Sequence, residues 1–250
     1  MKTVVISACG QVKQNNEDCY LINNKSYFDA NIENHEEIFL AAVFDGVGGS
    51  NYGEVAAQIS SHILASHFEF LANGNIDDLL KVVMTINEQL LFTAHEKPIY
   101  KGYATTIAGI KIQNDSLISF NVGDSRVYRC RLGLLKQLSY DDTYFNFMKS
   151  IGRVTDENAA KYKNSHIITS YLGKNDFEID DIRAILYDFG VMKEDIFLIC
   201  TDGVSDMCSD DILETILSSK EDLKNKSLQI QSIIESNGSK DNYTYILIEV

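Results

Sequence analysis

Short apolar runs, separated by polar and glycine-rich segments, mark the beginning of the chain. The runs Thr3–Ala8, Cys19–Ile22 and Ile38–Phe44 contain many β-branched and aromatic side chains, which is typical of strands. The stretch 23–37 is polar and rich in turn-forming residues, and it predicts a hairpin connection. These patterns therefore predict three strands before the first helix.

A helical pattern follows, with apolar residues recurring every three to four positions over 55–64. Asn51, with Glu54 three positions later, predicts a capping box at the start of this helix. Asn73-Gly74 predicts its end. A second helical pattern covers 76–90, so the sequence predicts two helices joined by a tight turn.

The second half of the chain returns to strands and ends with another pair of helices. The first four of its strands are predicted to form a meander, and the two helices are expected to run from Ser209 or Asp210 to Leu217 and over Leu223–Ser236. The stretch 139–175 breaks the pattern, with one helical piece at Asp156–Lys161. The predicted strands are Ala104–Ile112, Leu117–Val122, Arg126–Arg131, Leu134–Leu138, Ile182–Tyr187, Asp195–Cys200 and Tyr243–Val250.

This order of elements predicts an α+β fold. Two stacked, mainly antiparallel β-sheets flanked on each side by a pair of helices, an αββα sandwich, would bury all the apolar faces. The 250 residues, 45% of them hydrophobic, suffice for one domain over 1–250 with a sizeable core.

Charge and cysteine content narrow the function classes. A formal net charge of −14 argues against nucleic-acid and anionic membrane partners. No apolar run reaches the roughly 20 residues of a membrane helix, and no secretory leader is recognisable. Five cysteines without a Cys-x-x-Cys pattern indicate reduced thiols, so we expect a cytoplasmic protein.

Acidic residues recur at the ends of the predicted strands. Asp45 ends an apolar run and is followed by three glycines within four residues, and Asp202-Gly203 repeats this pattern. Such an Asp-Gly pair is often an ordinary turn. If several strand ends converge, however, their carboxylates would form an oxygen-rich site suited to Mg²⁺ or Mn²⁺. The other acids of this set are Glu17, Asp18, Asp124, Asp206 and Asp241.

The order of the motifs along the chain resembles a known family over nearly the whole length. The motifs are Lys13 with Glu17-Asp18, Asp45–Gly49, Ala104-Thr105-Thr106, Gly123–Arg126, Asp202-Gly203 with Asp206, and Asp241-Asn242. Together they resemble the metal-dependent Ser/Thr protein phosphatases of type 2C, in their bacterial branch. The resemblance implies hydrolysis of phosphoserine and phosphothreonine by a metal-activated water, with no phosphoenzyme.

The resemblance also implies roles for single residues. Two tightly bound Mn²⁺ or Mg²⁺ ions are expected, and a weaker third ion is allowed. By position, Asp45 would bridge two ions, and the Gly46 carbonyl would be a further ligand. Asp202 and Asp241 would complete one of these ions, and Glu17 and Asp18 would serve the other. Asp124 and Asp206 would hold the third ion. The expected substrates are phosphorylated proteins that a cognate Ser/Thr kinase modifies, and the chain is expected to be a monomer.

Two positions depart from the family pattern, and one segment is variable in it. Lys13 stands where the family usually has Arg, and Lys binds phosphate as a compact point charge without the two parallel bonds of a guanidinium. Val47 stands where many eukaryotic relatives have His, so water would protonate the leaving group. Residues 139–172 resemble the family's flap beside the site.

Other functions receive less support. Lys13 leaves open an inactive pseudophosphatase that acts as a regulatory binding protein. Asp188-Phe189-Gly190 matches a kinase motif, but the other kinase motifs are missing. The histidines show no zinc-protease pattern, and an acidic metal-buffering module would need a calcium loop that the sequence lacks.

Overall fold

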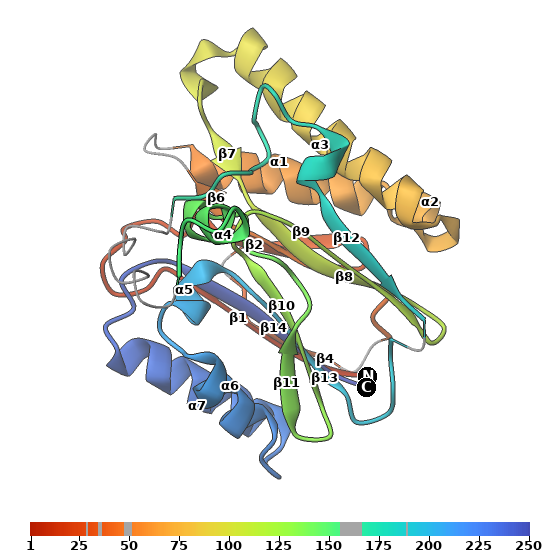
Figure 1. Cartoon of the computed structure of the whole chain (residues 1–250), viewed down its shortest axis with the longest axis vertical. Helices are drawn as coiled ribbons and strands as arrows, with labels where there is room; N and C mark the ends of the chain where they lie inside the picture. The colour runs from red at the N-terminus through yellow and green to blue at the C-terminus, as the bar shows by residue number, and fades with distance from the viewer. Residues whose placement is uncertain (29, 35–36, 48–51, 156–166, 189) are drawn as a thin grey trace.

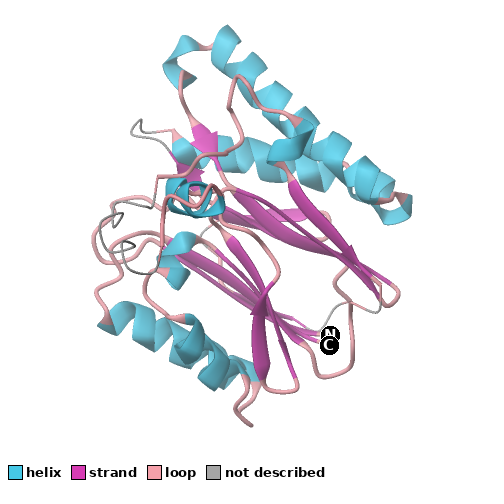
Figure 2. Ribbon diagram, viewed as in Figure 1, coloured by secondary structure: helices cyan, strands magenta, loops and turns pink. Residues whose placement is uncertain are grey.

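The computed structural model describes residues 1–28, 30–34, 37–47, 52–155, 167–188 and 190–250. Within these residues two antiparallel sheets stack face to face, and helices cover both outer faces (Figures 1 and 2). The predicted fold class, an αββα sandwich, is therefore confirmed.

Each sheet has six strands within the described residues, and both combine strands from distant parts of the chain. Sheet A has the order β11-β10-β13-β14-β1-β4, and sheet B has the order β12-β9-β8-β5-β2-β3. The strands of sheet A are β1 (Lys2–Ala8), β4 (Ile32–Asn34), β10 (Arg126–Arg131), β11 (Leu134–Gln137), β13 (Ile196–Cys200) and β14 (Tyr243–Glu249). The strands of sheet B are β2 (Cys19–Ile22), β3 (Lys25–Tyr27), β5 (Leu40–Phe44), β8 (Ile107–Gln113), β9 (Ser116–Val122) and β12 (Arg183–Tyr187).

A separate two-stranded ribbon pairs β6 (Gly46–Val47) with β7 (Ala104–Thr105). It continues from the end of β5, the strand that carries Asp45 at its end. β1 and β14 pair along their whole length, so the two ends of the chain lie side by side (Figure 1).

Helices from two parts of the chain form the outer layers. The helices over sheet B are α1 (Gly53–Ser66), α2 (Phe68–Asn73) and α3 (Ile76–Glu96), and those over sheet A are α6 (Asp210–Leu217) and α7 (Leu223–Ser236). Among the described residues, short helices also lie in the connections: η1 (Pro98–Tyr100), α4 (Tyr144–Ser150), η3 (Ile179–Asp181) and α5 (Asp202–Ser205).

The apolar core has three layers, one between the sheets and one beneath each helical layer. Strand β5 shows why. Ala42 and Phe44 pack with the helices over sheet B, while Ala41 and Val43 pack between the sheets. A strand covered on both faces needs apolar residues at every position, which explains its continuous apolar run.

The strand predictions were wrong in two places. The stretch 23–37 is not a simple hairpin connection, because it contains β3 and also β4, which pairs with β1 in the other sheet. The predicted meander is divided between the sheets, since β8 and β9 belong to sheet B and β10 and β11 to sheet A. Alternation identifies a strand but does not say which sheet it joins. The turn at Gly123–Ser125 connects β9 in sheet B to β10 in sheet A.

The helix predictions also need correction. The helix expected over 51–73 is interrupted at His67, where the ring Nδ1 lies 2.8 Å from the Ile63 carbonyl oxygen. Its observed N-cap is Tyr52, without a side-chain cap, and the predicted cap Asn51 lies outside the described residues. The helical piece predicted at 156–161 also lies outside them, while α4 was not predicted.

Candidate active site

The strand ends that carry the predicted acids meet at one end of the sandwich. Cys19 at the start of β2 pairs with Phe44 at the end of β5, so Asp18 and Asp45 flank one pair of strand ends. In sheet A, the last residue of β13, Cys200, pairs with both Arg126 of β10 and Tyr245 of β14. The acids of the neighbouring loops therefore come from both sheets.

Two threonines fix the backbone at Asp45. The Thr105 hydroxyl and the Thr106 amide donate to the Asp45 carbonyl oxygen at 2.8 Å and 2.9 Å. The Asp45 amide in turn donates to the Thr106 hydroxyl at 3.2 Å, and this hydroxyl lies 2.7 Å from that of Ser125. These bonds tie the end of β5 to the turn that carries Asp124.

Burial and mutual repulsion raise the pKa values of this acidic cluster. The pKa of Asp45 lies well above its usual value, because of burial first and then the charges of Asp202, Asp18 and Asp124. Burial, followed by neighbouring acids, raises the pKa of Asp18 to about 7 and that of Asp124 to about 8. Acids that are far apart in the sequence are therefore close enough in the fold to raise the pKa values of their neighbours by charge repulsion.

One buried carboxylate oxygen is left without a partner. The Thr201 hydroxyl donates to Asp18 Oδ2 at 2.9 Å, while Asp18 Oδ1 is buried and has no hydrogen-bond partner among the described residues. A buried, unpaired carboxylate oxygen is costly unless a proton or a cation meets it. Oxygen donors of this kind fit Mg²⁺ or Mn²⁺. The residues present thus suit the metals that the family resemblance implies.

The acids do not yet form a finished coordination sphere. Within the described parts of the chain, no group of three or more His, Cys, Asp or Glu side chains could hold a metal ion as it stands. The carboxylates would have to turn toward a common ion. Their assignment as ligands remains a prediction, supported by burial, charge and the unpaired oxygen of Asp18.

Asn242 holds the segment that precedes β2. Its Oδ1 accepts a hydrogen bond from the Glu17 amide at 2.9 Å, and its Nδ2 donates to the carbonyl oxygens of Asn15 and Cys9 at 2.8 Å and 2.9 Å. A Cβ atom on Gly203 would lie 1.9 Å from the Asn242 carbonyl oxygen. The Asp-Gly and Asp-Asn motifs therefore require each other for packing, which the sequence did not reveal.

Lys13 contacts one of the predicted metal ligands. Its Nζ lies 2.7 Å from Asp241 Oδ1, and both side chains are partly exposed. A lysine expected to bind phosphate thus lies at the site, where it neutralises a predicted ligand. To bind phosphate it would have to leave Asp241.

The acids predicted for a third ion line a small cavity of about 190 Å³. Asp124, Asp202 and Asp206 lie around it. Arg126 lines it as well, and its Nη2 lies 2.6 Å from Asp141 Oδ2. The sequence analysis missed Asp141, although the consecutive acids Asp141-Asp142 just after a strand were a visible signal.

A family model described as protein phosphatase 2C matches residues 15–239. The chain belongs to the protein phosphatase 2C family. The prediction of a phosphatase of this type, made from the order of the motifs, is therefore confirmed.

Relatives and solved structures of this family resemble the chain over most of its length. It is 27% identical to the serine/threonine phosphatase stp of Listeria welshimeri over 246 residues, which cover 96% of this chain and 92% of that protein. It is 29% identical to the serine/threonine protein phosphatase PstP of Mycobacterium tuberculosis over 252 residues, which cover 96% of this chain and 43% of that longer protein.

Two solved structures carry the same fold. The crystal structure of the M. tuberculosis phosphatase PstP/Ppp has a TM-score of 0.84 at 26% identity, covering 99% of this chain and 97% of that one. The catalytic domain of PstP in complex with two manganese ions has a TM-score of 0.78 at 25% identity, covering 99% and 98%. A similar chain thus binds two manganese ions.

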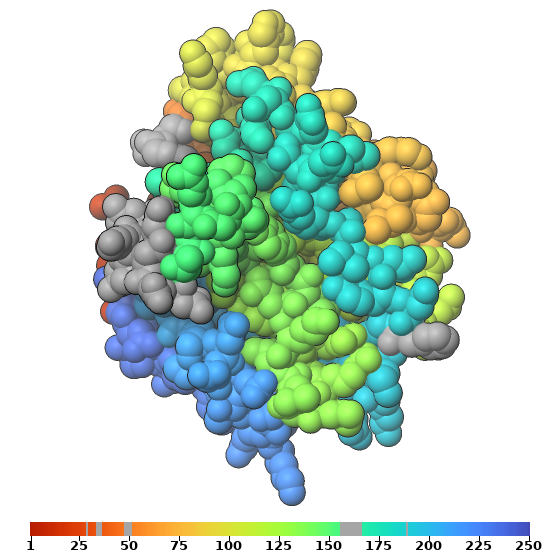
Figure 3. All heavy atoms as spheres, in the orientation of Figure 1, coloured from red at the N-terminus to blue at the C-terminus, as the bar shows by residue number. Residues whose placement is uncertain are grey.

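In this member of the protein phosphatase 2C family, the structure describes residues 139–155 and 167–172 of the predicted flap. Within 139–172, the described residues include α4, whose first residue Tyr144 donates its amide to the Ile167 carbonyl oxygen at 2.9 Å. In the space-filling view the segment around α4 lies against the segment that begins at 167 (Figure 3). Among the described residues, no helix has the length and apolar character needed to cross a membrane.

Proposed function

We propose that this chain hydrolyses phosphoserine and phosphothreonine in proteins, using water activated between two Mn²⁺ or Mg²⁺ ions. One observation carries the proposal. Asp18, Asp45 and Asp124 come from three separate loops, and burial first, then repulsion from neighbouring acids that include Asp202 in each case, raises the pKa values of all three. Such a concentration of carboxylates is costly unless cations bind it.

Metal ions bound by these acids would lower the pKa of a water molecule and neutralise charge that develops on the phosphoryl oxygens. The chain's own contribution is to hold the ligands. Asp45 would bind both ions, and the Gly46 carbonyl would be a further ligand. Asp202 and Asp241 would complete one ion, and Glu17 and Asp18 would serve the other. Asp124 and Asp206 would serve a weaker third ion.

Lys13 would orient the substrate after leaving Asp241. Its ammonium group would attract the phosphoryl group as a point charge, with less directional control than a guanidinium. Val47 carries no proton to give to the leaving group, so solvent water would protonate the departing serine or threonine oxygen.

The first test is turnover. Hydrolysis of p-nitrophenyl phosphate and of a phosphothreonine peptide would be measured with Mn²⁺, with Mg²⁺ and with chelator. We expect metal-dependent turnover that Asp45→Asn abolishes together with metal binding. Asp211→Asn, on the exposed first turn of α6, is the matched control and should behave like the wild type. Activity of Asp45→Asn near that of the wild type would refute the bridging role.

A second candidate is the inactive pseudophosphatase that binds phosphoproteins without hydrolysing them. The contact between Lys13 and Asp241 favours it, because the lysine already neutralises a predicted ligand. Metal binding without turnover in the folded wild-type protein would support this candidate over the enzyme.

The cellular setting is also a proposal. We infer phosphoprotein targets of a cognate Ser/Thr kinase and a monomer from the family resemblance, and a cytoplasmic location from the cysteine pattern. Analytical ultracentrifugation would test the monomer, since a dimer at micromolar concentration would contradict it.

A further inference from the structure

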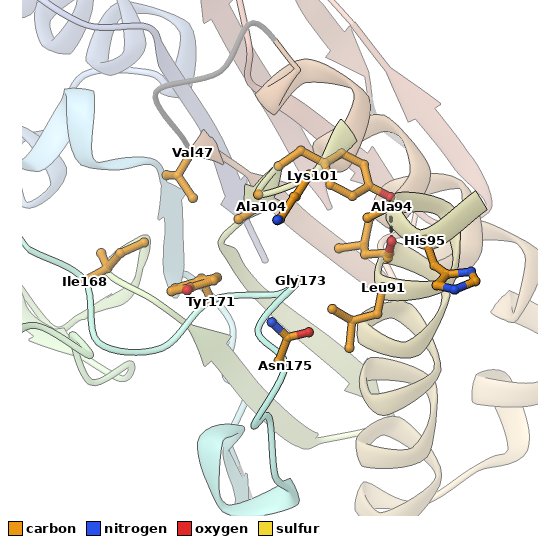
Figure 4. Close-up of a pocket in the computed structure, with 13 residues that line it drawn as sticks. Val47, Leu91, Ala94, His95, Lys101, Ala104, Ile168, Tyr171, Gly173 and Asn175 are labelled. Atoms are coloured by element: carbon orange, nitrogen blue, oxygen red, sulfur yellow. Dashed lines mark hydrogen bonds between the residues drawn. The ribbon is translucent and has the colours of Figure 1, made fainter. Parts of the chain in front are cut away.

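A pocket of about 670 Å³ lies beside the candidate active site, between the C-terminal turns of α3 and residues 168–175 (Figure 4). Leu91 on α3 faces Tyr171 and Asn175 on the opposite loop (Figure 4). Val47, two residues after Asp45, also lines the pocket. None of the proposed roles in catalysis involves this space.

One wall of the pocket continues into the backbone that holds the predicted metal ligands. In the β6–β7 ribbon, Gly46 pairs with Thr105 and Val47 pairs with Ala104. Thr105 also exchanges two backbone hydrogen bonds with Leu172, at 2.9 Å and 3.1 Å. A molecule in this pocket would therefore lie against the same short ribbon that continues from Asp45.

The walls of the pocket are mainly apolar. Leu90, Leu91 and Ala94 line it from α3, and Ile168 and Tyr171 line it from the facing loop. The hydroxyl of Tyr103, a further lining residue, donates to the Leu90 carbonyl oxygen at 2.9 Å, so this polar atom is already satisfied. An apolar side chain would fit this environment better than a polar one.

The described pocket lining carries a positively charged lysine and no acid, whereas the chain as a whole has a net charge of −14. The chain has 36 acidic and 22 basic residues, yet no Asp or Glu is among the described residues that line the pocket. Lys101 lies at the pocket, is exposed, and has no ion pair within the described part of the chain. His95 differs, because its Nδ1 lies 3.3 Å from Glu96. Lys101 is thus the cation available for an anionic occupant.

We propose that this pocket binds the phosphoprotein substrate beside its phosphorylated residue. It would take one apolar side chain between α3 and the loop, with a neighbouring carboxylate of the substrate at Lys101. The inference rests on the proposed function for the identity of its occupant and goes beyond it by assigning a sequence preference. A small ester such as p-nitrophenyl phosphate has no neighbouring side chain to fill the pocket.

The first experiment varies the peptide, which leaves the folding of the protein untouched. Fluorescently labelled peptides would carry a non-hydrolysable phosphonate in place of phosphothreonine, and their binding would be measured in Mn²⁺. In a series of peptides, a leucine would occupy each position in turn on the N-terminal and on the C-terminal side of the phosphonate residue. We expect one favoured position, where replacement of leucine by serine weakens binding about tenfold. Equal binding at every position would overturn the proposal.

The second experiment exchanges charges between protein and peptide. With an aspartate beside the favoured leucine, Lys101→Glu should weaken binding about threefold to tenfold, and a peptide with lysine there should bind this variant better than it binds the wild type. Lys97→Glu is the matched control, because it makes the same charge change four residues away, outside the described lining. An equal shift in both variants would overturn the role of Lys101.

The two proposals can fail separately. Metal-dependent turnover of p-nitrophenyl phosphate tests the catalytic function, whereas phosphonate binding needs no turnover. Turnover without any peptide preference would overturn the pocket and leave the phosphatase intact. Selective peptide binding without turnover would support the pocket and refute the catalytic proposal.

Discussion

Replacing Asn242 by alanine tests whether this side chain holds the N-terminal part of the site. Asn242 is 3% exposed, and its side chain makes hydrogen bonds to the Glu17 amide and to the carbonyl oxygens of Cys9 and Asn15. Alanine removes all three bonds at once and leaves the backbone groups without their partners. The expected effects are lower stability and weaker metal binding through Glu17.

The size of the stability loss follows from these contacts. A net contribution of about 0.5–1.5 kcal/mol for each of the three hydrogen bonds gives a loss of about 1.5–4.5 kcal/mol in the free energy of unfolding. For a domain of this size, a loss of 1 kcal/mol lowers Tm by about 2–4 °C, so the expected decrease is about 3–18 °C. The buried position argues against full replacement of these bonds by water.

Urea unfolding followed by circular dichroism, in chelator and then in Mn²⁺, measures the effect. Asn237→Ala is the matched control, since this exposed asparagine donates one side-chain hydrogen bond, to the Met207 carbonyl oxygen at 2.8 Å. Its cost should stay below about 1 kcal/mol. A loss for Asn242→Ala no larger than that of the control would refute the reasoning. Unchanged Mn²⁺ affinity would refute the link to Glu17.

Three further predictions concern the same site. Lys13→Arg should lower KM for a phosphopeptide, because a guanidinium binds phosphate through two parallel bonds, and an unchanged or raised KM in steady-state assays would contradict this. In chelator, the protein should become more stable as pH falls from 8 toward 5, measured by Tm. The pKa values of about 7 for Asp18 and about 8 for Asp124 exceed the usual 3.8. Below these values the native state therefore binds protons that the unfolded chain releases, which stabilises the native state. The stabilisation is lost as pH rises through about 7 and 8. Mn²⁺ should remove the trend, and a metal-free Tm that rises with pH would contradict it. Gly203→Ala should unfold at lower urea than the wild type, because its Cβ would lie 1.9 Å from the Asn242 carbonyl oxygen, and an unchanged midpoint would show that the loop can move.

Local patterns determined much of the secondary structure. The sequence predicted β2 at Cys19–Ile22, β10 at Arg126–Arg131 and α7 at Leu223–Ser236 with the bounds that the structure has. In each case the periodicity of the chain and its flanking turn residues agree with the environment that the fold provides. The acids at strand ends were visible for the same reason, since each follows or precedes an apolar run.

Pairings between distant segments were decided by the tertiary structure. The sequence could not assign β9 and β10 to different sheets, because alternation along a strand is the same in either sheet. It also gave no sign that Lys13 contacts Asp241, a pair that is 228 positions apart (241 − 13). Likewise, the bonds of Asn242 to the segment before β2 depend on β1 and β14 lying side by side.

The sequence by itself thus determined the order of the acids along the chain and predicted which residues would bind metal and phosphate. Only the tertiary structure decided which of them face one another. The burial of Asp45 and its repulsion by Asp18 and Asp124 arise where the two sheets meet, whereas the apolar pocket beside Val47 arises where α3 faces residues 168–175. The physical reason is that a carboxylate's chemistry depends on the charges and solvent around it, which neighbours in the sequence do not fix.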